Sequence, residues 1–265
     1  MSKTSLLRQL HQGPKILVLP NAWDAASARI FETTGFPAIA TTSAGVANSL
    51  GYPDGEHISR DEMIDAVRRI VNAVSVPVTA DVEAGYGDAL KTAQALVQIG
   101  ACGMNFEDST REGSLVDASA QAKIIESIRS NTDLVINART DVLLLGIGDP
   151  ATRLERAIER LNAYRAAGAD SLFVPGVRDA ETIAKLARAV RGPLNILAVA
   201  GAPPIAELER LGVRRVTIGS GAMRATMGLT QRIAQELFER GTYSSFTEGS
   251  IAYPDANRLF RVAAT

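Results

Sequence analysis

The sequence predicts an α/β fold, a (β/α)8 barrel of the TIM type that forms one domain over residues 1–265. Short apolar segments alternate with helical segments along the chain, and no low-complexity linker or long run of charge divides them. The length suits one barrel of about 250 residues, although it also admits two small domains. An open doubly wound sheet is the structural alternative, but eight strand–helix units in an undivided chain favour closure.

Eight apolar segments are typical of buried parallel strands: residues 16–20, 38–42, 77–81, 103–107, 134–139, 171–175, 194–198 and 215–218. A helical pattern follows each of them, at residues 25–34, 60–74, 89–99, 118–130, 152–167, 180–190, 205–211 and 223–240. Gly100 and Gly168 end two of these helices, because the left-handed position after a helix favours glycine. An extra helix is expected at residues 2–11. Residues 241–265 form a C-terminal helical tail that either packs on its own barrel or contacts another subunit.

Composition excludes several classes of protein. A net charge of −1 gives no basic field for nucleic acid, and no apolar run approaches the roughly 20 residues of a membrane span. Residues 1–10 hold no apolar core of a signal peptide, so we expect a cytoplasmic protein, which the single cysteine also favours. Two histidines are too few for a three-histidine zinc site. No lysine follows a predicted strand, so a lysine Schiff base is not expected.

Three neighbouring strands turn polar side chains toward the barrel interior. Because side chains alternate along a strand, Asp81, Glu107 and Arg139 lie opposite the apolar face of their respective strands. Glu83 lies two residues after Asp81, just beyond the end of the strand, so the same alternation directs it to the same side as Asp81. The same alternation assigns Cys102 to the core that faces the helices.

Uncompensated charge at this rim predicts a metal site. One arginine cannot balance Asp81, Glu83 and Glu107, and three negative charges against one positive charge leave a deficit that a divalent cation would supply. All of these ligands are oxygens, which favours Mg2+, or Mn2+, over Zn2+. A structural network of salt bridges at the rim is the alternative.

Small residues follow two of the strands. Thr42, Ser43 and Ala44 offer backbone N–H groups that can form an anion nest for a carboxylate, with a plain strand-to-loop turn as the alternative. Gly85 and Gly87 permit a sharp turn or a close approach of the backbone to a ligand. Both features lie on the side of the barrel where the polar strand ends meet.

Four segments together resemble the isocitrate lyase/phosphoenolpyruvate mutase superfamily. They are residues 22–54 (AWDAASARIFETTGFPAIATTSAGVANSLGYPD), 79–88 (TADVEAGYGD), 100–108 (GACGMNFED) and 136–141 (INARTD). The resemblance implies a Mg2+-dependent barrel, usually a tetramer whose last helix is exchanged between subunits. It also implies bond making or breaking next to a 2-oxo acid through a pyruvate-enolate-like intermediate. We therefore expect a homotetramer or dimer that binds a small 2-oxo acid or dicarboxylate.

The resemblance also implies roles for residues that match the motifs. Asp81 is the main metal anchor, Glu83 and Glu107 join it directly or through water, and Asp54 lies nearby. The substrate is bound by Thr42, Ser43, Ala44, Asp81 and Arg139, and the catalytic residues are Arg139 and Glu107.

Departures from the family pattern narrow the expected reaction. Lyases of the family carry a Lys-Lys-Cys-Gly-His type of loop with a catalytic cysteine, whereas residues 108–113 (DSTREG) contain no cysteine or histidine. The expected activity is therefore a Mg2+-dependent carbon–carbon lyase or decarboxylase on a 2-oxo or malate-type diacid. A phosphonopyruvate-type mutase or hydrolase is one alternative, which the short loop counts against. A non-catalytic barrel that binds 2-oxo acids is another.

Overall fold

Parallel strands form one continuous sheet in the computed structural model, which describes residues 1–260. The order in space is β1-β9-β8-β7-β6-β5-β4-β3-β2. The strands are β1 (Leu17–Leu19), β2 (Asn21–Ala22), β3 (Ile39–Thr41), β4 (Val78–Asp81), β5 (Gly103–Glu107), β6 (Val135–Arg139), β7 (Ser171–Phe173), β8 (Leu194–Leu197) and β9 (Arg215–Thr217). β1 and β2 are two parts of one expected strand, interrupted at Pro20, which has no N–H for the ladder. Because β1 pairs with β9 and β2 with β3, the sheet closes, and the predicted (β/α)8 barrel is confirmed.

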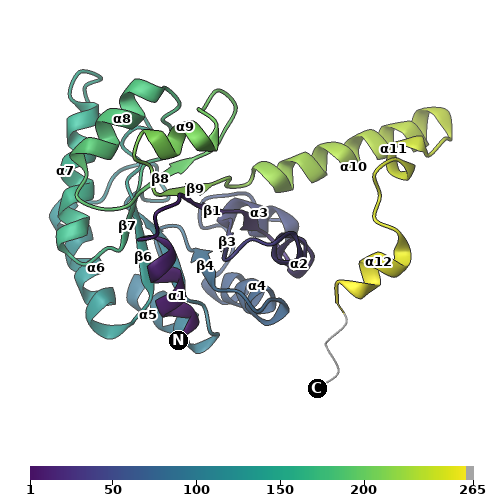
Figure 1. Ribbon diagram of the computed structural model, residues 1–265, viewed down its shortest axis with the longest axis horizontal. Coiled ribbons are helices and arrows are strands. Elements are labelled where there is room, and N and C mark those ends of the chain that lie inside the picture. Colours follow the sequence, from purple (N-terminus) through teal and green to yellow (C-terminus); the bar gives the residue numbers. More distant parts are fainter. Residues whose placement is uncertain (261–265) are drawn as a thin grey trace.

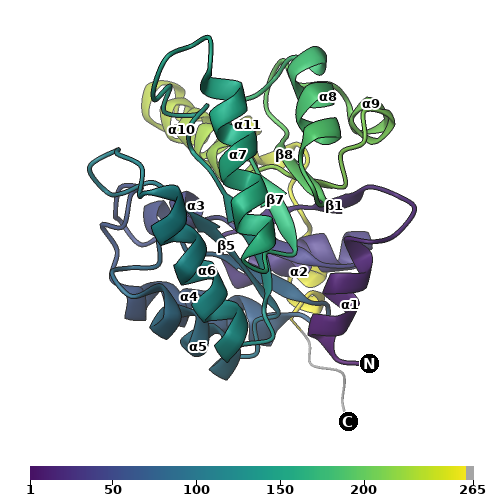
Figure 2. The ribbon, with the colours of Figure 1, turned by 90° about the vertical axis from the view of Figure 1, so that its left-hand side faces the viewer.

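Most of the helices surround the sheet on its outside, while those of the C-terminal segment extend away from it (Figures 1 and 2). They are α1 (Lys3–Leu10), α2 (Ala25–Thr34), α3 (Ser43–Ser49), α4 (Arg60–Ala73), α5 (Ala89–Gln98), α6 (Ala118–Asn131), α7 (Arg153–Ala166), α8 (Ala180–Ala189), α9 (Ile205–Arg210), α10 (Gly221–Arg240), α11 (Ser244–Thr247) and α12 (Tyr253–Arg258). Side-chain caps define several helix starts: the Asp24 and Ser59 side chains each accept a backbone N–H in a capping box. The expected helix before the first strand is confirmed as α1.

The sequence analysis did not distinguish α3 from a loop. Thr42 caps this helix by accepting a hydrogen bond from the Gly45 N–H. Gly45 has to be glycine, because a Cβ atom there would lie 2.5 Å from the Thr42 Cγ2 and 3.0 Å from the Trp23 Cβ. This close packing fixes Ser43, the first residue of α3, at the carboxyl end of β3.

Strand alternation places apolar side chains against the helices. Met104 and Phe106 belong to the main core under the helix layer, as expected. Cys102 is buried but belongs to a different cluster, which includes Leu7 of α1 and Val135. The prediction that Cys102 is a core residue is confirmed by its burial, although it belongs to the smaller cluster beside α1 and not to the main core.

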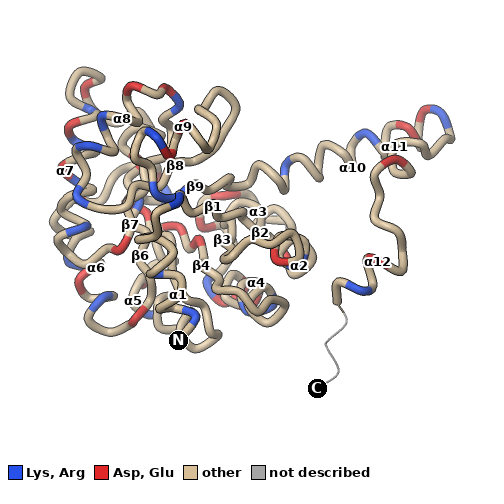
Figure 3. Tube along the Cα trace, viewed as in Figure 1, with Lys and Arg blue, Asp and Glu red and all other residues tan. Residues whose placement is uncertain are grey.

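The C-terminal segment leaves the barrel. α10 extends away from it, and α11 and α12 follow as an arm (Figure 1). The end of this arm contacts the barrel, because the Arg29 Nε of α2 donates to the Leu259 carbonyl oxygen at 2.6 Å. Residues of positive and negative charge are interspersed along α10 (Figure 3), yet the Phe238 side chain is 93% exposed and that of Leu237 is 48% exposed. None of the helices within residues 1–260 is long and apolar enough to cross a lipid bilayer.

We propose that this arm contacts another copy of the chain, because a single barrel leaves its apolar side chains uncovered. Introducing negative charge through Leu237→Glu with Phe238→Glu should reduce the oligomer mass measured by light scattering, with an unchanged circular dichroism spectrum. Gln235→Glu is the matched control on the same helix and should leave the mass unaltered. A monomeric parent protein, or a double variant of unchanged mass, would contradict the proposal.

Candidate active site at the carboxyl ends of the strands

A cavity of about 160 Å³ lies at the carboxyl ends of the strands. The predicted site residues that line it are Thr42, Ser43, Ala44, Asp54, Asp81 and Arg139. Glu83 and Glu107 instead line an adjoining recess, which also includes Asp54 and Arg139. The structure thus brings all of the predicted residues to one end of the barrel, but distributes them between two connected spaces.

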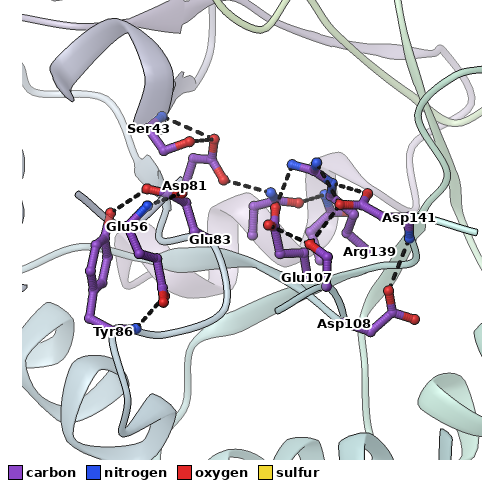
Figure 4. A network of polar contacts seen from close by, with 12 residues as sticks. Ser43, Glu56, Asp81, Glu83, Tyr86, Glu107, Asp108, Arg139 and Asp141 are labelled. Carbon is purple, nitrogen blue, oxygen red and sulfur yellow. Dashed lines mark hydrogen bonds and ion pairs between the residues drawn. The ribbon is translucent and has the colours of Figure 1, made fainter. Parts of the chain in front are cut away.

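Asp81 is held on both of its carboxylate oxygens (Figure 4). Its Oδ2 accepts hydrogen bonds from the Ser43 N–H at 3.0 Å and the Ser43 hydroxyl at 2.8 Å, and its Oδ1 accepts one from the Asn105 amide at 2.7 Å. The Asn137 side-chain amide in turn donates to the Asn105 Oδ1 at 2.9 Å. Asn105 was not among the predicted site residues. It lies two residues before Glu107 on the same strand, so its side chain faces the barrel interior as well, and this pattern could have identified it.

Arg139 forms the centre of an ion-pair cluster (Figure 4). Its Nε and Nη2 contact the two carboxylate oxygens of Asp141 at 2.6 and 2.9 Å, and its Nη1 lies 2.6 Å from the Glu107 Oε2. Ser109 lies within hydrogen-bond distance of both carboxylates. A guanidinium group carries five N–H donors, so two of those on Arg139 remain for a ligand. Burial lowers the pKa of Arg139, but Glu107 and Asp141 outweigh this effect and raise the pKa above its ordinary value.

A fully buried carboxylate, Asp108, supports this cluster from behind. Its Oδ1 accepts the Asp141 N–H at 3.0 Å. Its Oδ2 accepts hydrogen bonds from the Arg160 Nε at 2.7 Å and the Tyr164 hydroxyl at 2.6 Å. Because Arg160 and Tyr164 belong to α7, the outer helix layer fixes the backbone of Asp141. Sequence analysis named Asp108 only as part of a motif, because no local pattern shows that these segments meet.

Glu83 is strained, and it is held by two further strained residues. Glu56, Glu83 and Tyr86 have φ angles of 55°, 49° and 53°, in the left-handed region that disfavours side chains. The Glu83 carboxylate accepts the Glu56 N–H at 2.8 Å and the Tyr86 hydroxyl at 2.9 Å, and the Glu56 carboxylate accepts the Tyr86 N–H at 2.6 Å (Figure 4). The hydrogen bonds compensate for the strain and keep Glu83 directed at this end of the barrel.

Negative charge is in excess at the rim of the site, around Arg139. Burial and the nearby Asp81 raise the pKa of Glu83 to about 7. Burial also raises the pKa of Glu107, with Asp141 and Asp81 adding to the effect and Arg139 opposing it. The pKa of Asp54 is raised by burial and by Asp81. A single guanidinium group does not neutralise these carboxylates.

The donor set fits a hard divalent cation in chemistry, because every candidate ligand is a carboxylate oxygen in a region of excess negative charge. Within residues 1–260, however, no three Asp, Glu, His or Cys side chains are grouped so that they hold a metal by themselves. The contacts described above account for this, because the carboxylates of Asp81, Glu83 and Glu107 are each directed at protein donors. Asp81 and Asp54 face the main cavity and could bind a cation directly, whereas Glu83 and Glu107 would act through water.

The expected anion nest is incomplete. The Thr42 N–H donates to the Ala22 carbonyl oxygen at 3.1 Å, and the Ser43 N–H donates to Asp81. The prediction that three successive N–H groups face a ligand was therefore wrong for Thr42 and Ser43. The Thr42 N–H is part of the hydrogen bonding between β2 and β3, and the Ser43 N–H orients the Asp81 carboxylate. Ala44 still lines the cavity, as expected.

Comparison with known proteins identifies the family. The model of the phosphoenolpyruvate phosphomutase family matches residues 7–238. The chain belongs to the phosphoenolpyruvate mutase/isocitrate lyase superfamily. It is 40% identical over 212 residues to an uncharacterized protein of Mycobacterium tuberculosis (strain ATCC 25618 / H37Rv), covering 79% of this chain and 80% of that protein. It is 33% identical over 223 residues to an oxaloacetate decarboxylase of Rhodopseudomonas palustris (strain HaA2), covering 80% of this chain and 75% of that enzyme.

Two solved structures share the fold at lower identity. Oxaloacetate acetylhydrolase in complex with its product oxalate has a TM-score of 0.86 and 26% identity, covering 97% of this chain and 93% of that one. The 2,3-dimethylmalate lyase has a TM-score of 0.84 and 27% identity, covering 98% of this chain and 94% of that one. The superfamily to which the chain belongs thus includes lyases and decarboxylases of oxo acids and related diacids.

The raised pKa of Glu83 predicts how stability depends on pH without divalent cations. The folded state binds a proton up to about pH 7, whereas the unfolded carboxyl group releases it near its ordinary value of 4.5. The free energy of unfolding should therefore fall as pH rises between these values. Glu83→Gln should make the slope of Tm against pH shallower when both proteins are measured by calorimetry in EDTA. An equal slope for parent and variant would show that Glu83 is not the responsible group.

Proposed function

We propose that this chain is a divalent-metal-dependent carbon–carbon lyase or decarboxylase that acts on a 2-oxo or malate-type dicarboxylic acid. The observation that carries the proposal is the cavity of about 160 Å³ with Asp81 on one side and Arg139 on the other. Carboxylates in excess favour a cation, and the remaining N–H donors of Arg139 favour an anionic ligand. The named oxaloacetate decarboxylase and 2,3-dimethylmalate lyase relatives support this class of substrate.

The cation proposed for this site is Mg2+, with Mn2+ as a substitute. When bound, it would act as a Lewis acid on oxygens of the 2-oxo acid and would favour the developing enolate charge. Asp81 would hold it, with Asp54 contributing directly and Glu83 and Glu107 through water. Because Ser43 and Asn105 fix both oxygens of Asp81, that carboxylate loses little conformational freedom on binding.

The chain's own residues also favour the charged transition state. Arg139 faces the cavity and can donate to substrate oxygens, which stabilises charge that grows during the reaction more than charge already present. Leu144 and Phe173 line the same cavity and limit the access of water, which strengthens these electrostatic interactions. Arg139 also lies over the Phe173 ring, 5.8 Å from its centroid, so its orientation is restricted.

A substrate panel with Mg2+ tests the proposal. We expect pyruvate, or another 2-oxo acid, from oxaloacetate or from 2,3-dimethylmalate. We expect no useful release of glyoxylate from isocitrate, and none of pyruvate and succinate from 2-methylisocitrate. The reason is that residues 109–113 supply no thiol or imidazole, and a positioned acid or base contributes about 10²–10⁴ in rate. Robust glyoxylate release would contradict this account. Turnover of phosphonopyruvate would favour the mutase or hydrolase alternative. No turnover of any of these substrates, together with tight binding of oxalate, would favour a non-catalytic barrel.

Arg139 provides a sharper test of the catalytic role. Arg139→Lys keeps the positive charge but loses the planar fork that contacts two carboxylates and a ligand together. We expect kcat/KM to fall on the order of tenfold to a thousandfold, or about 1.4–4 kcal/mol, with little change in Tm. A variant with normal turnover, or one that simply unfolds, would indicate that Arg139 serves only the rim network.

A further inference from the structure

A second arginine lies in the same cavity without a counterion. Arg215 is 1% exposed and projects from β9 into the barrel, where it lines the cavity together with Asp81 and Arg139. Among residues 1–260, no Asp or Glu oxygen lies within 4.0 Å of its guanidinium nitrogens. Its Nε is buried with no hydrogen-bond partner in this part of the chain. A buried charge is costly unless an anion or a set of hydrogen bonds compensates for it.

The neighbour of Arg215 on the barrel floor does not neutralise it. His11 Nδ1 lies 2.8 Å from the Leu7 carbonyl oxygen, which can only accept, so this nitrogen carries the hydrogen atom. His11 Nε2 is then an acceptor, and the Arg215 Nη1 donates to it across 3.3 Å. Burial, with a further contribution from Arg215, lowers the pKa of His11 to about 4, so the ring is neutral near pH 7. The pair anchors the guanidinium group but leaves its charge unmatched.

The surroundings of Arg215 are polar and provide space for a ligand. Asn195, its register partner on β8, and Thr217 line the same cavity. The Thr79 hydroxyl also lines it and is buried with no protein partner among the described residues. The volume of about 160 Å³ is well above the roughly 10–15 Å³ that one water molecule needs. Arg139, by contrast, already contacts two carboxylates.

We propose that Arg215 is the receptor for the second carboxylate of the substrate, so that a diacid spans the cavity from Asp81 and Arg139 to the barrel floor. This inference rests on the proposed function and narrows it. A cation that binds a carboxylate stabilises the ground state of that group and opposes its loss as CO2. Arg215 therefore favours cleavage of the C2–C3 bond of a malate-type diacid over simple decarboxylation. In that cleavage the C2 hydroxyl loses its proton and becomes a carbonyl, the electrons of the broken bond pass to C3, and C3 takes up a proton. The products are therefore a 2-oxo acid and a monocarboxylic acid, and both carboxylates are retained.

The role of Arg215 is tested by comparing how the intact protein, with Mg2+, binds a dicarboxylate and the matching monocarboxylate. The probes are 3,3-difluorooxaloacetate, its monocarboxylate analogue 3,3-difluoro-2-oxobutanoate, and oxalate, which is too short to reach both ends. Calorimetry should show that the parent protein prefers the dicarboxylate over the monocarboxylate on the order of tenfold to a hundredfold. Arg215→Met should abolish this preference and leave the oxalate affinity unchanged. Arg214→Met is the matched control, since Arg214 is the exposed neighbouring residue, and it should retain the preference.

Each outcome separates the inference from the proposed function. If oxalate does not bind the parent protein with Mg2+, the proposed function fails. Two outcomes with normal oxalate binding refute only the role of Arg215. In one, the parent protein does not prefer the dicarboxylate over the monocarboxylate; in the other, Arg215→Met retains that preference. If Arg215→Met does not fold, Arg215→Lys is the deciding variant. Lysine is shorter and lacks the planar fork of arginine, so dicarboxylate binding should weaken on the order of tenfold while oxalate binding stays unchanged. Unchanged dicarboxylate binding by Arg215→Lys would overturn the proposal.

Discussion

The ion-pair cluster around Arg139 is the interaction on which the organisation of this end of the barrel depends. Arg139 joins β5 to β6 by contacting Glu107 and Asp141. Asp141 is fixed through its N–H by Asp108, which receives hydrogen bonds from two side chains of α7. The position of the guanidinium group in the cavity is therefore set by packing in the outer helix layer. This arrangement explains how a buried cluster of mostly negative groups stays ordered within a closed barrel.

Excess negative charge connects the structure to its proposed chemistry. Burial raises the pKa values of Glu83 and Glu107, and the proximity of Asp81 adds to both effects. A divalent cation would relieve this repulsion, and an anionic ligand would then compensate for the cation and for Arg139. The floor of the cavity has the opposite character, because Arg215 is a buried cation that forms no ion pair with a carboxylate among the described residues. A diacid bound at the metal is thus complementary to both ends of the same space.

Strand alternation made the barrel and much of its rim predictable. The inward placement of Asp81 and Arg139 follows from a period of two, and the structure brings both to one cavity. Contacts between distant segments were not predictable in this way. The hydrogen bond that joins His11 to Arg215 spans most of the chain, and no local pattern indicates it. The number of free N–H groups predicted at residues 42–44 was too high. A sequence pattern shows which N–H groups exist but not which of them already donate to acceptors within the protein.

The central claim is that the cavity binds a divalent cation at Asp81 together with a 2-oxo acid. Electron paramagnetic resonance of Mn2+ titrated into the protein measures this directly, because free and bound Mn2+ give different signals. The account predicts one Mn2+ site per chain, tighter binding of Mn2+ in the presence of oxalate, and loss of the site in Asp81→Ala. Mn2+ binding that is unaffected by oxalate, or that persists in Asp81→Ala, would contradict it.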